Sequence, residues 1–238
     1  MTIIGRSGCG KTTALKLVNG LITPDAGRVL VQGEDVVKTD PVALRRRIGY
    51  AIQSVGLFPH MTVEKNIAYV PSISGIDGWK GRERREKVSA LLERVGLDPA
   101  LAGRYPRALS GGQRQRVGIA RALAAGPELL LMDEPFGAVD EITRIQLQEE
   151  IRKIHRESGI TILFVTHDIA EALKLGSRVL VLDQGTVQQC DAPEELLRHP
   201  ATEFVAKLVE QQRRTCALPE ERLTDCKFSG AASPPILT

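Results

Sequence analysis

Two glycine-rich segments of the chain have residue types and spacing suited to binding phosphate groups. In residues 5–12, the glycines allow successive backbone N–H groups to converge on phosphate oxygens, and a lysine and a threonine follow. We expect Lys11 to reach the β- and γ-phosphates of a nucleoside triphosphate, and the Thr12 hydroxyl to bind Mg²⁺. The alternative, a glycine-rich turn with an incidental lysine, is disfavoured by the apolar strand before the segment and the helix after it.

The second segment, residues 109–113, has the sequence Leu-Ser-Gly-Gly-Gln and opens a predicted helix over residues 113–124. The N-terminus of a helix is an anion-binding end. One molecule cannot place both segments on one triphosphate if they stand far apart in its fold, but a head-to-tail pair can. ATP would then join two copies, and hydrolysis would release them. The predicted nucleotide contacts are Gly5, Arg6, Ser7, Gly8, Cys9, Gly10, Lys11, Thr12 and Thr13 of the first segment, and Ser110, Gly111, Gly112 and Gln113 of the second.

A pair of acidic residues, Asp133 and Glu134, directly follows the apolar residues 129–132. A carboxylate at the end of a buried strand is costly unless it meets a cation. We therefore assign Asp133 to Mg²⁺, through its water shell, and Glu134 to the attacking water as general base. The alternative is a strand-end pair that simply faces solvent, which the preceding apolar run and Pro135 disfavour.

Two further polar residues follow predicted strands. His167 comes after the apolar run 160–165, at the same sheet edge as the acidic pair, so we expect a γ-phosphate contact rather than a purely structural role. Gln53 follows residues 48–52 and is expected to contact Mg²⁺ or the attacking water. The predicted catalytic residues are thus Glu134, His167 and Gln53, and the predicted metal ligands are Thr12, Gln53 and Asp133.

Nearly continuous apolar runs separated by helices predict an α/β fold with a parallel sheet buried on both faces. In such sheets, ligands bind beyond the carboxyl ends of the strands. A helix is predicted over residues 11–18. The predicted strands are residues 2–4, 27–31 (closed by a turn at Gln32-Gly33), 48–52, 129–132 and 160–165, with a terminal hairpin of 178–183 and 186–190.

Residues 54–113 have a different character and are predicted to form an inserted helical subdomain. Val88, Leu91, Leu92 and Val95 lie at helical spacing, and Gly96 closes that helix. The subdomain separates two parts of a core, residues 1–53 and 114–190. Residues 191–210 are predicted to hold C-terminal helices over 193–198 and 201–209, and residues 211–238 a flexible tail.

The composition restricts the class of protein. A net charge of +3 over 238 residues is too small to indicate nucleic acid binding, so the basic clusters 45–47 and 82–85 are interpreted as solvated helix faces. No apolar run approaches the roughly 18 residues that span a bilayer, and no signal peptide precedes residue 5. The 4 cysteines have no metal-type spacing, as expected of reduced cytosolic thiols. We expect a soluble, cytoplasmic protein that could work at a membrane only from its surface.

Taken together, these residues resemble the nucleotide-binding subunits of ABC transporters over nearly the whole chain. In that family's terms the motifs are the P-loop (5–12), the Q-loop (Gln53), the signature (109–113), the Walker B strand with Glu134, the D-loop (137–140) and the switch His167. The resemblance implies a P-loop NTPase fold with a RecA-like core, ATP hydrolysis with Mg²⁺, a nucleotide contact for Asp140, and a homodimer or paired ATPase subunit.

The finer resemblance is to bacterial osmoprotectant importers, which take up glycine betaine, choline or related quaternary amines. It is carried by residues 133–140, 142–144, 187–190 and 193–205. It implies membrane permease subunits, an extracytoplasmic solute-binding protein, and a peripheral location at the cytoplasmic face of the inner membrane. Because the ATPase does not touch the solute, importers of sulfonate, nitrate or amino acids stay open as alternatives. A soluble ABC ATPase acting on ribosomes or DNA is disfavoured, because such proteins usually carry two of these domains or long coiled coils.

The chain departs from the family's pattern at both ends. Met1 stands four residues before Gly5, where the family carries early strands and an aromatic residue that stacks on adenine. We interpret this as a missed upstream start; the alternative is a true truncation, which could be a non-catalytic remnant. From the position of residue 238, we also expect that the regulatory CBS pair of some osmoprotectant ATPases is not part of this chain. Cys9 is interpreted as a small filler, or alternatively as a reactive thiol that ATP protects.

Overall fold

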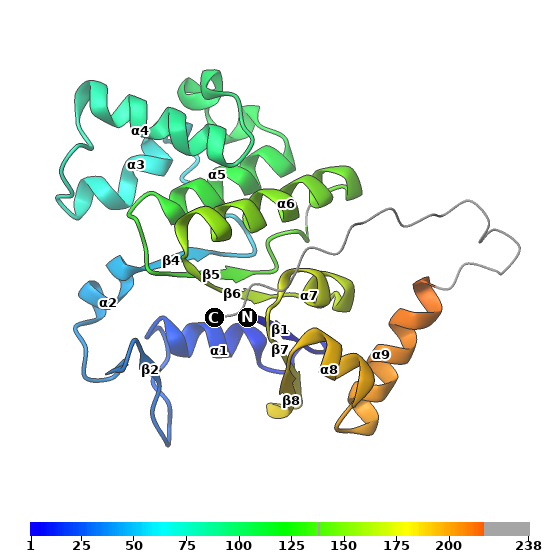
Figure 1. Cartoon of the computed structure of the whole chain (residues 1–238). Helices are drawn as coiled ribbons and strands as arrows, with labels where there is room; N and C mark the ends of the chain where they lie inside the picture. The colour runs from blue at the N-terminus through cyan, green and yellow to red at the C-terminus, as the bar shows by residue number, and fades with distance from the viewer. Residues whose placement is uncertain (138, 217–238) are drawn as a thin grey trace, which may run out of the picture.

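A six-stranded sheet forms the centre of the molecule, in the order β4-β5-β6-β1-β7-β8 (Figure 1). The computed structural model describes residues 1–137 and 139–216. The strands are β1 Thr2–Ile4, β4 Ile48–Ala51, β5 Leu129–Asp133, β6 Thr161–Val165, β7 Val179–Asp183 and β8 Thr186–Asp191. Every pairing from β4 to β7 is parallel, and β7 and β8 form an antiparallel hairpin. The predicted parallel sheet and terminal hairpin are therefore confirmed.

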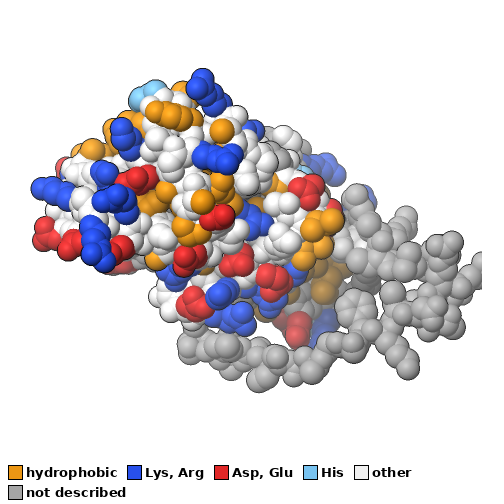
Figure 2. Space-filling model, turned by 90° about the horizontal axis from the view of Figure 1, so that it is seen from above, with side chains coloured by type: hydrophobic (Ala, Val, Ile, Leu, Met, Phe, Trp, Pro, Cys, Tyr) orange, Lys and Arg blue, Asp and Glu red, His pale blue; other side chains and the backbone are white. Residues whose placement is uncertain are grey.

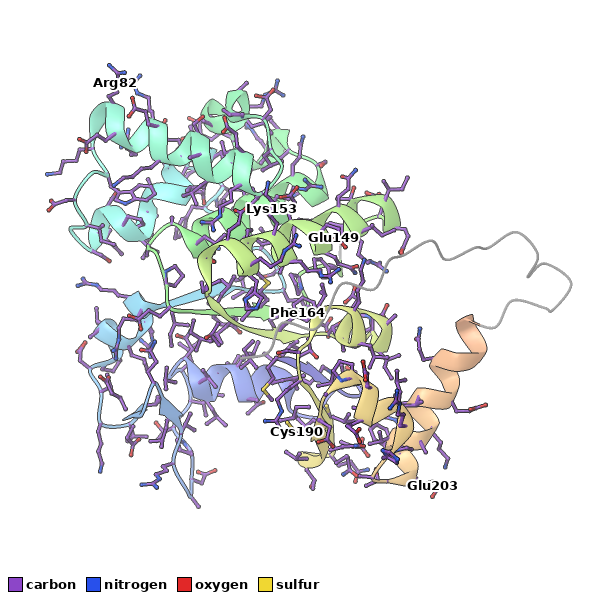
Figure 3. The ribbon with its side chains drawn as sticks, viewed as in Figure 1. Arg82, Glu149, Lys153, Phe164, Cys190 and Glu203 are labelled. Atoms are coloured by element: carbon purple, nitrogen blue, oxygen red, sulfur yellow. The ribbon has the colours of Figure 1, made fainter. Side chains whose placement is uncertain are left out.

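Helices cover both faces of this sheet, which explains why its strands are apolar throughout rather than alternating. One face packs against α1 (Lys11–Val18) and α2 (Pro41–Arg47), with Leu15 and Leu44 buried between them and the strands. The other face packs against α5 (Gly111–Leu123) and α6 (Glu141–Ser158). Phe164 of β6 points into this second core (Figure 3). The predicted helix 11–18 is confirmed with the same bounds.

The third group of helices packs around the end of the sheet that carries the hairpin. It consists of α7 (Ile169–Leu175), α8 (Pro193–Arg198) and α9 (Glu203–Cys216), which bury apolar side chains with those of β1 and β7. The prediction for α8 has the observed bounds. The prediction for α9 was too short, because the polar residues that follow Val209 continue the helix to Cys216. The predicted tail therefore begins too early, and residues 217–238 lie outside the described part of the chain.

Residues 54–110 contain helices and no strand among their described positions, as predicted. They form α3 (Val63–Ile73), α4 (Gly81–Arg94) and the 3-10 helices η1 (Pro99–Gly103) and η2 (Pro106–Ala108). On α4, Val88 and Leu92 are fully buried, and Gly96 follows the helix with φ 67°. Figure 2 shows this layer from above, with basic and acidic side chains interspersed over its surface. Within the described ranges, no helix is both long and apolar enough to cross a membrane.

One predicted strand is mostly absent. Only β2 (Leu30–Val31) forms from the predicted 27–31, and it pairs with β3 (Glu34–Asp35) in a separate two-stranded sheet. Gly27 has φ 78°, a left-handed conformation that interrupts an extended chain. The predicted turn is confirmed, because Gln32 and Gly33 both have positive φ, 53° and 81°, as a tight hairpin turn requires.

Candidate functional site

The loop between β1 and α1 has glycine where a side chain would collide or where the backbone is left-handed. A Cβ on Gly5 would lie 2.1 Å from the carbonyl oxygen of Leu182 in β7. Gly8 and Gly10 have φ values of 79° and 103°, which favour glycine. A Cβ on Gly8 would meet nothing within 4 Å. The loop is thus packed against the sheet on one side and open at Gly8, as a cradle for phosphate needs.

Lys11 begins α1 and turns its side chain back across this loop. Its Nζ donates to the carbonyl oxygens of Gly5 at 2.8 Å and Arg6 at 3.0 Å, and the residue is only 6% exposed. Gly10, at the N-cap, has no side chain to cap the helix, so the first-turn N–H groups stay available to an anion. The loop therefore places one buried cation and one helix N-terminus at the same point.

Asp133 is the last residue of β5 and lies beside Thr12. The Thr12 hydroxyl donates to Oδ1 of Asp133 at 3.2 Å, and Asp133 is 4% exposed. Burial is the main reason that the pKa of Asp133 is raised, and the neighbouring Glu134 raises it further. Burial and the carboxylate of Asp133 together raise the pKa of Tyr50 to about 12. A buried carboxylate beside a hydroxyl supplies the hard oxygen ligands that Mg²⁺ prefers, so these residues fit that ion.

Glu134, Gln53 and His167 come together at the carboxyl ends of three neighbouring strands, β5, β4 and β6. Gln53 Nε2 donates to Oε2 of Glu134 at 3.1 Å, and His167 Nδ1 lies 3.4 Å from the same oxygen. Glu134 has φ 45°, and its backbone N–H donates to the Val165 carbonyl at 3.0 Å. The three residues that the sequence analysis assigned to catalysis therefore converge on one carboxylate oxygen.

The second glycine-rich segment forms the capped N-terminus of α5. The Ser110 hydroxyl accepts from the Gln113 N–H at 3.2 Å, and the Gln113 side chain accepts from the Ser110 N–H at 2.9 Å. A Cβ on Gly112 would lie 2.9 Å from Cγ2 of Thr143, so glycine lets α5 approach α6 closely. The segment is thus rigid, and its exposed side faces an open cavity.

This cavity has a volume of about 360 Å³ and is lined by all four predicted residues of the segment and by Asp140. Asp140 caps α6 by accepting from the Thr143 N–H at 3.0 Å, and this hydrogen bond lowers the pKa of Asp140. None of the residues that line the cavity belongs to the Gly5–Thr13 segment. Ala138, in the predicted 137–140 motif, lies outside the described residues.

Four predicted contacts of the first loop lie in different environments. Ser7 and Thr13 are exposed. The guanidinium of Arg6 lies 5.0 Å from the centre of the Phe204 ring of α9, so it contacts a helix rather than the loop. Cys9 is only 4% exposed, and its carbonyl accepts from the Gly185 N–H at 3.1 Å. The Cys9 thiol therefore packs as a small buried group.

The sequence analysis did not predict that Arg121 holds the segment after β4, at Val55 and Gly56. Arg121 of α5 donates from Nη1 to the Gly56 carbonyl at 2.6 Å and from Nη2 to the Val55 carbonyl at 2.8 Å. Val55 has φ 62°, and its Cγ1 would lie 3.0 Å from a Cβ on Gly118. Burial lowers the pKa of Arg121. An arginine within the apolar run that ends α5 is a signal that this side chain is partly buried and needs a partner, but it does not indicate which segment supplies that partner.

Known proteins resemble the chain at the level of sequence and fold. A family model described as "ABC transporter" matches residues 1–137. The glycine betaine/carnitine/choline transport ATP-binding protein OpuCA of Bacillus subtilis is 50% identical over 91% of this chain and 56% of its own length. The osmoprotectant import ATP-binding protein OsmV of Salmonella typhimurium is 50% identical over 89% of this chain and 55% of its own length.

Among solved structures, a dimer of the ATP-binding cassette MJ0796 in a post-hydrolysis state, bound to ADP and Pi, has the same fold. Its TM-score is 0.74 and its sequence identity 34%, over 81% of this chain and 84% of that one. The chain spans about half the length of the two curated relatives named above, 56% and 55%.

Proposed function

The chain belongs to the ABC transporter family, and we propose that it is the ATP-binding and ATP-hydrolysing subunit of an importer. In this proposal, two copies close head to tail around two ATP molecules. Each ATP lies between the Gly5–Thr13 loop of one copy and residues 110–113 of the other. Closure and opening of the pair then drive the transport cycle.

One observation carries this proposal: the chain holds two incomplete phosphate-binding ends that share no residue. Lys11 and the Glu134 cluster stand at one end, whereas Ser110 and Asp140 line a cavity whose walls contain no residue of that cluster. A second copy supplies what each end lacks. The dimeric state named for MJ0796 supports the same arrangement here.

We assign the first loop to phosphate binding. Its N–H groups and the Lys11 ammonium, now held by two loop carbonyls, would contact phosphate oxygens instead. Thr12 and Asp133, with Gln53, would hold Mg²⁺, and the ion, when bound, would offset negative charge on the phosphates. In the described part of the chain, no group of three or more His, Cys, Asp or Glu side chains is arranged so that it could hold a metal ion by itself. This suits Mg²⁺, which keeps several of its waters.

We assign Glu134 as the general base. A water oxygen attacks the γ-phosphorus, the bond from that phosphorus to ADP breaks, and a water proton passes to the Glu134 carboxylate. Gln53 and His167 both contact Oε2 of Glu134, so they hold the carboxylate by one oxygen and fix where the other stands. His167 is also placed to contact the γ-phosphate.

We propose an osmoprotectant such as glycine betaine, choline or carnitine as the solute, on the basis of the relatives OpuCA and OsmV. The proposed partners are a second ATPase subunit, membrane permease subunits and an extracytoplasmic solute-binding protein, with no nucleic acid. The chain would then be peripheral, at the cytoplasmic face of the membrane, with α3 and α4 presented to the permease.

Mixing two inactive variants tests the composite site. Lys11→Ala damages the first loop, and Ser110→Arg damages the second segment. A dimer of one variant with the other regains one intact site, formed by the loop of the Ser110→Arg copy and the segment of the Lys11→Ala copy. We expect each variant alone to be inactive and an equal mixture to reach about one quarter of wild-type ATP turnover.

The matched control mixes Lys11→Ala with Glu134→Gln. Both changes damage the same end, so no dimer of these two variants contains an intact site, and turnover should stay at background. Recovery in this control, or no recovery in the first mixture, would contradict the composite site.

A further inference from the structure

A buried acid on α7 touches the segment that carries His167. Glu171 is 7% exposed, and its Oε2 accepts from the Thr166 hydroxyl at 2.5 Å. The Thr166 hydroxyl oxygen also accepts from the Asp168 N–H at 3.0 Å. Asp168 in turn caps α7 by accepting from the Ala170 N–H at 2.7 Å. These hydrogen bonds fix the backbone on both sides of His167.

The same acid faces α6, the helix that begins next to the second cavity. Arg144 Nε lies 3.8 Å from Oε1 of Glu171. This nitrogen is buried and, among the described residues, has no hydrogen-bond partner. A second bridge joins the two helices nearer the surface, because Lys174 Nζ donates to Gln148 Oε1 at 2.9 Å and lies 3.5 Å from Glu149 (labelled in Figure 3). Glu171 therefore stands between α6 and the His167 segment.

Stability alone does not account for an acid at this position. Burial raises the pKa of Glu171, and the opposing contributions come from Thr166, Arg144 and His167. The ion pair with Arg144 is long, and a buried charge with a distant partner costs more than it returns. The short contact of Glu171 is its hydrogen bond to the Thr166 hydroxyl. Glu171 therefore acts mainly on the position of Thr166, and through it on the next residue, His167.

We propose that Glu171, acting through the Thr166 hydroxyl, is a positioning residue that holds His167 against Glu134. The inference rests on the proposed function, in which His167 and Glu134 act together on ATP. In this proposal, Glu171 connects α6 to His167. α6 begins at the cavity that we assign to the partner's nucleotide, and His167 contacts the nucleotide bound by its own chain.

Replacing Thr166 with valine, which has nearly the same shape but no hydroxyl, tests this inference. In Thr166→Val, we expect the ring signals of His167 in ¹H–¹⁵N spectra of the nucleotide-free protein to shift or broaden, while those of the other histidines stay. The His167→Ala variant assigns the signals. Thr161→Val, at the exposed start of β6, is the matched control and should leave the His167 ring signals unchanged. Glu171→Gln, whose amide oxygen can still accept from Thr166, should give a smaller change of the same kind.

ATP turnover supplies the second measurement. Thr166→Val should lower kcat about tenfold or more, because small misplacements of a reacting group are costly, while KM stays within about twofold. In a His167→Ala background, Thr166→Val should add no further loss. Unchanged His167 signals in Thr166→Val, or an equal loss of kcat with and without His167, would overturn the inference. A wild-type protein without ATP turnover would refute the proposed function, and the ring signals would still decide this inference.

Discussion

The two ends of the chain that we propose bind phosphate differ in how many of their side-chain contacts are already formed. At the first, Lys11 is held by two carbonyls, Asp133 is buried beside Thr12, and two side chains meet one oxygen of Glu134. At the second, Ser110 satisfies the end of its own helix, and the cavity beside it is open and polar. The first end thus gathers buried charged groups and close side-chain contacts, whereas the second is a capped helix end beside an open cavity.

The two ends also differ in their contribution to the stability of the nucleotide-free protein. A buried acid with a raised pKa and a left-handed glutamate both cost free energy in the free protein. A capping box and an N-cap aspartate both contribute stability. Costly features therefore gather at the end that we assign to chemistry, whereas the end that completes the partner's site is built from ordinary helix caps.

We expect the largest effect from a substitution that removes the proposed general base at the first end and leaves the second end unchanged. Glu134→Gln should lower ATP turnover by on the order of 10²–10⁴-fold, because an amide cannot take the water proton, and uptake of glycine betaine in cells should fall with it. ATP binding and closure need only the loop and the partner's segment, so the variant should form a stable dimer in Mg-ATP. Turnover assays and light scattering check both. Retained turnover, or a protein that stays monomeric in saturating Mg-ATP, would contradict the assignment.

Affinity for ATP sharpens the comparison. Lys11→Ala should weaken ATP binding to the monomer by roughly 10- to 100-fold, since charge-assisted hydrogen bonds are worth about 1.5–3 kcal/mol each. Ser110→Arg should leave the monomer's affinity unchanged, because residues 110–113 serve the nucleotide on the partner's loop. Lys16→Ala, on the exposed side of the same helix as Lys11, is the control. Equal effects of Lys11→Ala and Ser110→Arg on monomer affinity, measured by calorimetry, would remove the distinction between the two ends.

The smallest expected effect concerns stability against pH: Asp133 and Asp140 should contribute to the pH dependence of folding stability with opposite signs. Because the pKa of Asp133 is raised above 3.8, the folded chain keeps this proton longer than the unfolded chain, and stability is lost as pH rises through that interval. Asp133→Asn should therefore raise the melting temperature of the nucleotide-free protein at neutral pH by about 2–4 °C for each 1 kcal/mol gained. The gain should shrink as pH falls toward 3.8.

Asp140 should show the opposite sign. Its pKa is lowered below 3.8 by the Thr143 hydrogen bond, so its contribution to stability is present above that pH and is lost as pH falls. Asp140→Asn should lower the melting temperature at neutral pH, and only slightly, because asparagine also caps helices well. Melting curves between about pH 2.5 and 8 in EDTA measure both variants, because the Asp140 contribution is lost only below its unfolded pKa. The same sign in the two variants would contradict the contrast between the two ends.

The parts of the fold that follow from local pattern could be predicted from the sequence. The bounds of β1, α1 and α8 were predicted to the residue, because each lies between clear start and stop signals. The convergence of Gln53, Glu134 and His167 also followed, since the carboxyl ends of parallel strands share one edge. Local pattern and sheet topology together are enough to place these three side chains.

Contacts between distant segments could not be predicted in this way. Nothing near Val55 in the sequence indicates that Arg121 holds its carbonyl, and Glu171 looks like an ordinary charge on a short helix. The strand predicted over 27–31 was shortened by the left-handed conformation of Gly27, which the apolar pattern of the segment does not indicate. Such features arise only when the fold brings the segments together.

The left-handed Val55 has a mechanical consequence. A β-branched residue in this conformation costs on the order of 1–3 kcal/mol, and it persists only while its surroundings impose it. The two hydrogen bonds from Arg121 are part of those surroundings. Because Val55 lies two residues after Gln53, they also hold the backbone from which Gln53 reaches Glu134. A residue of α5 on the second face of the sheet thus supports a contact to Glu134 that it does not itself make.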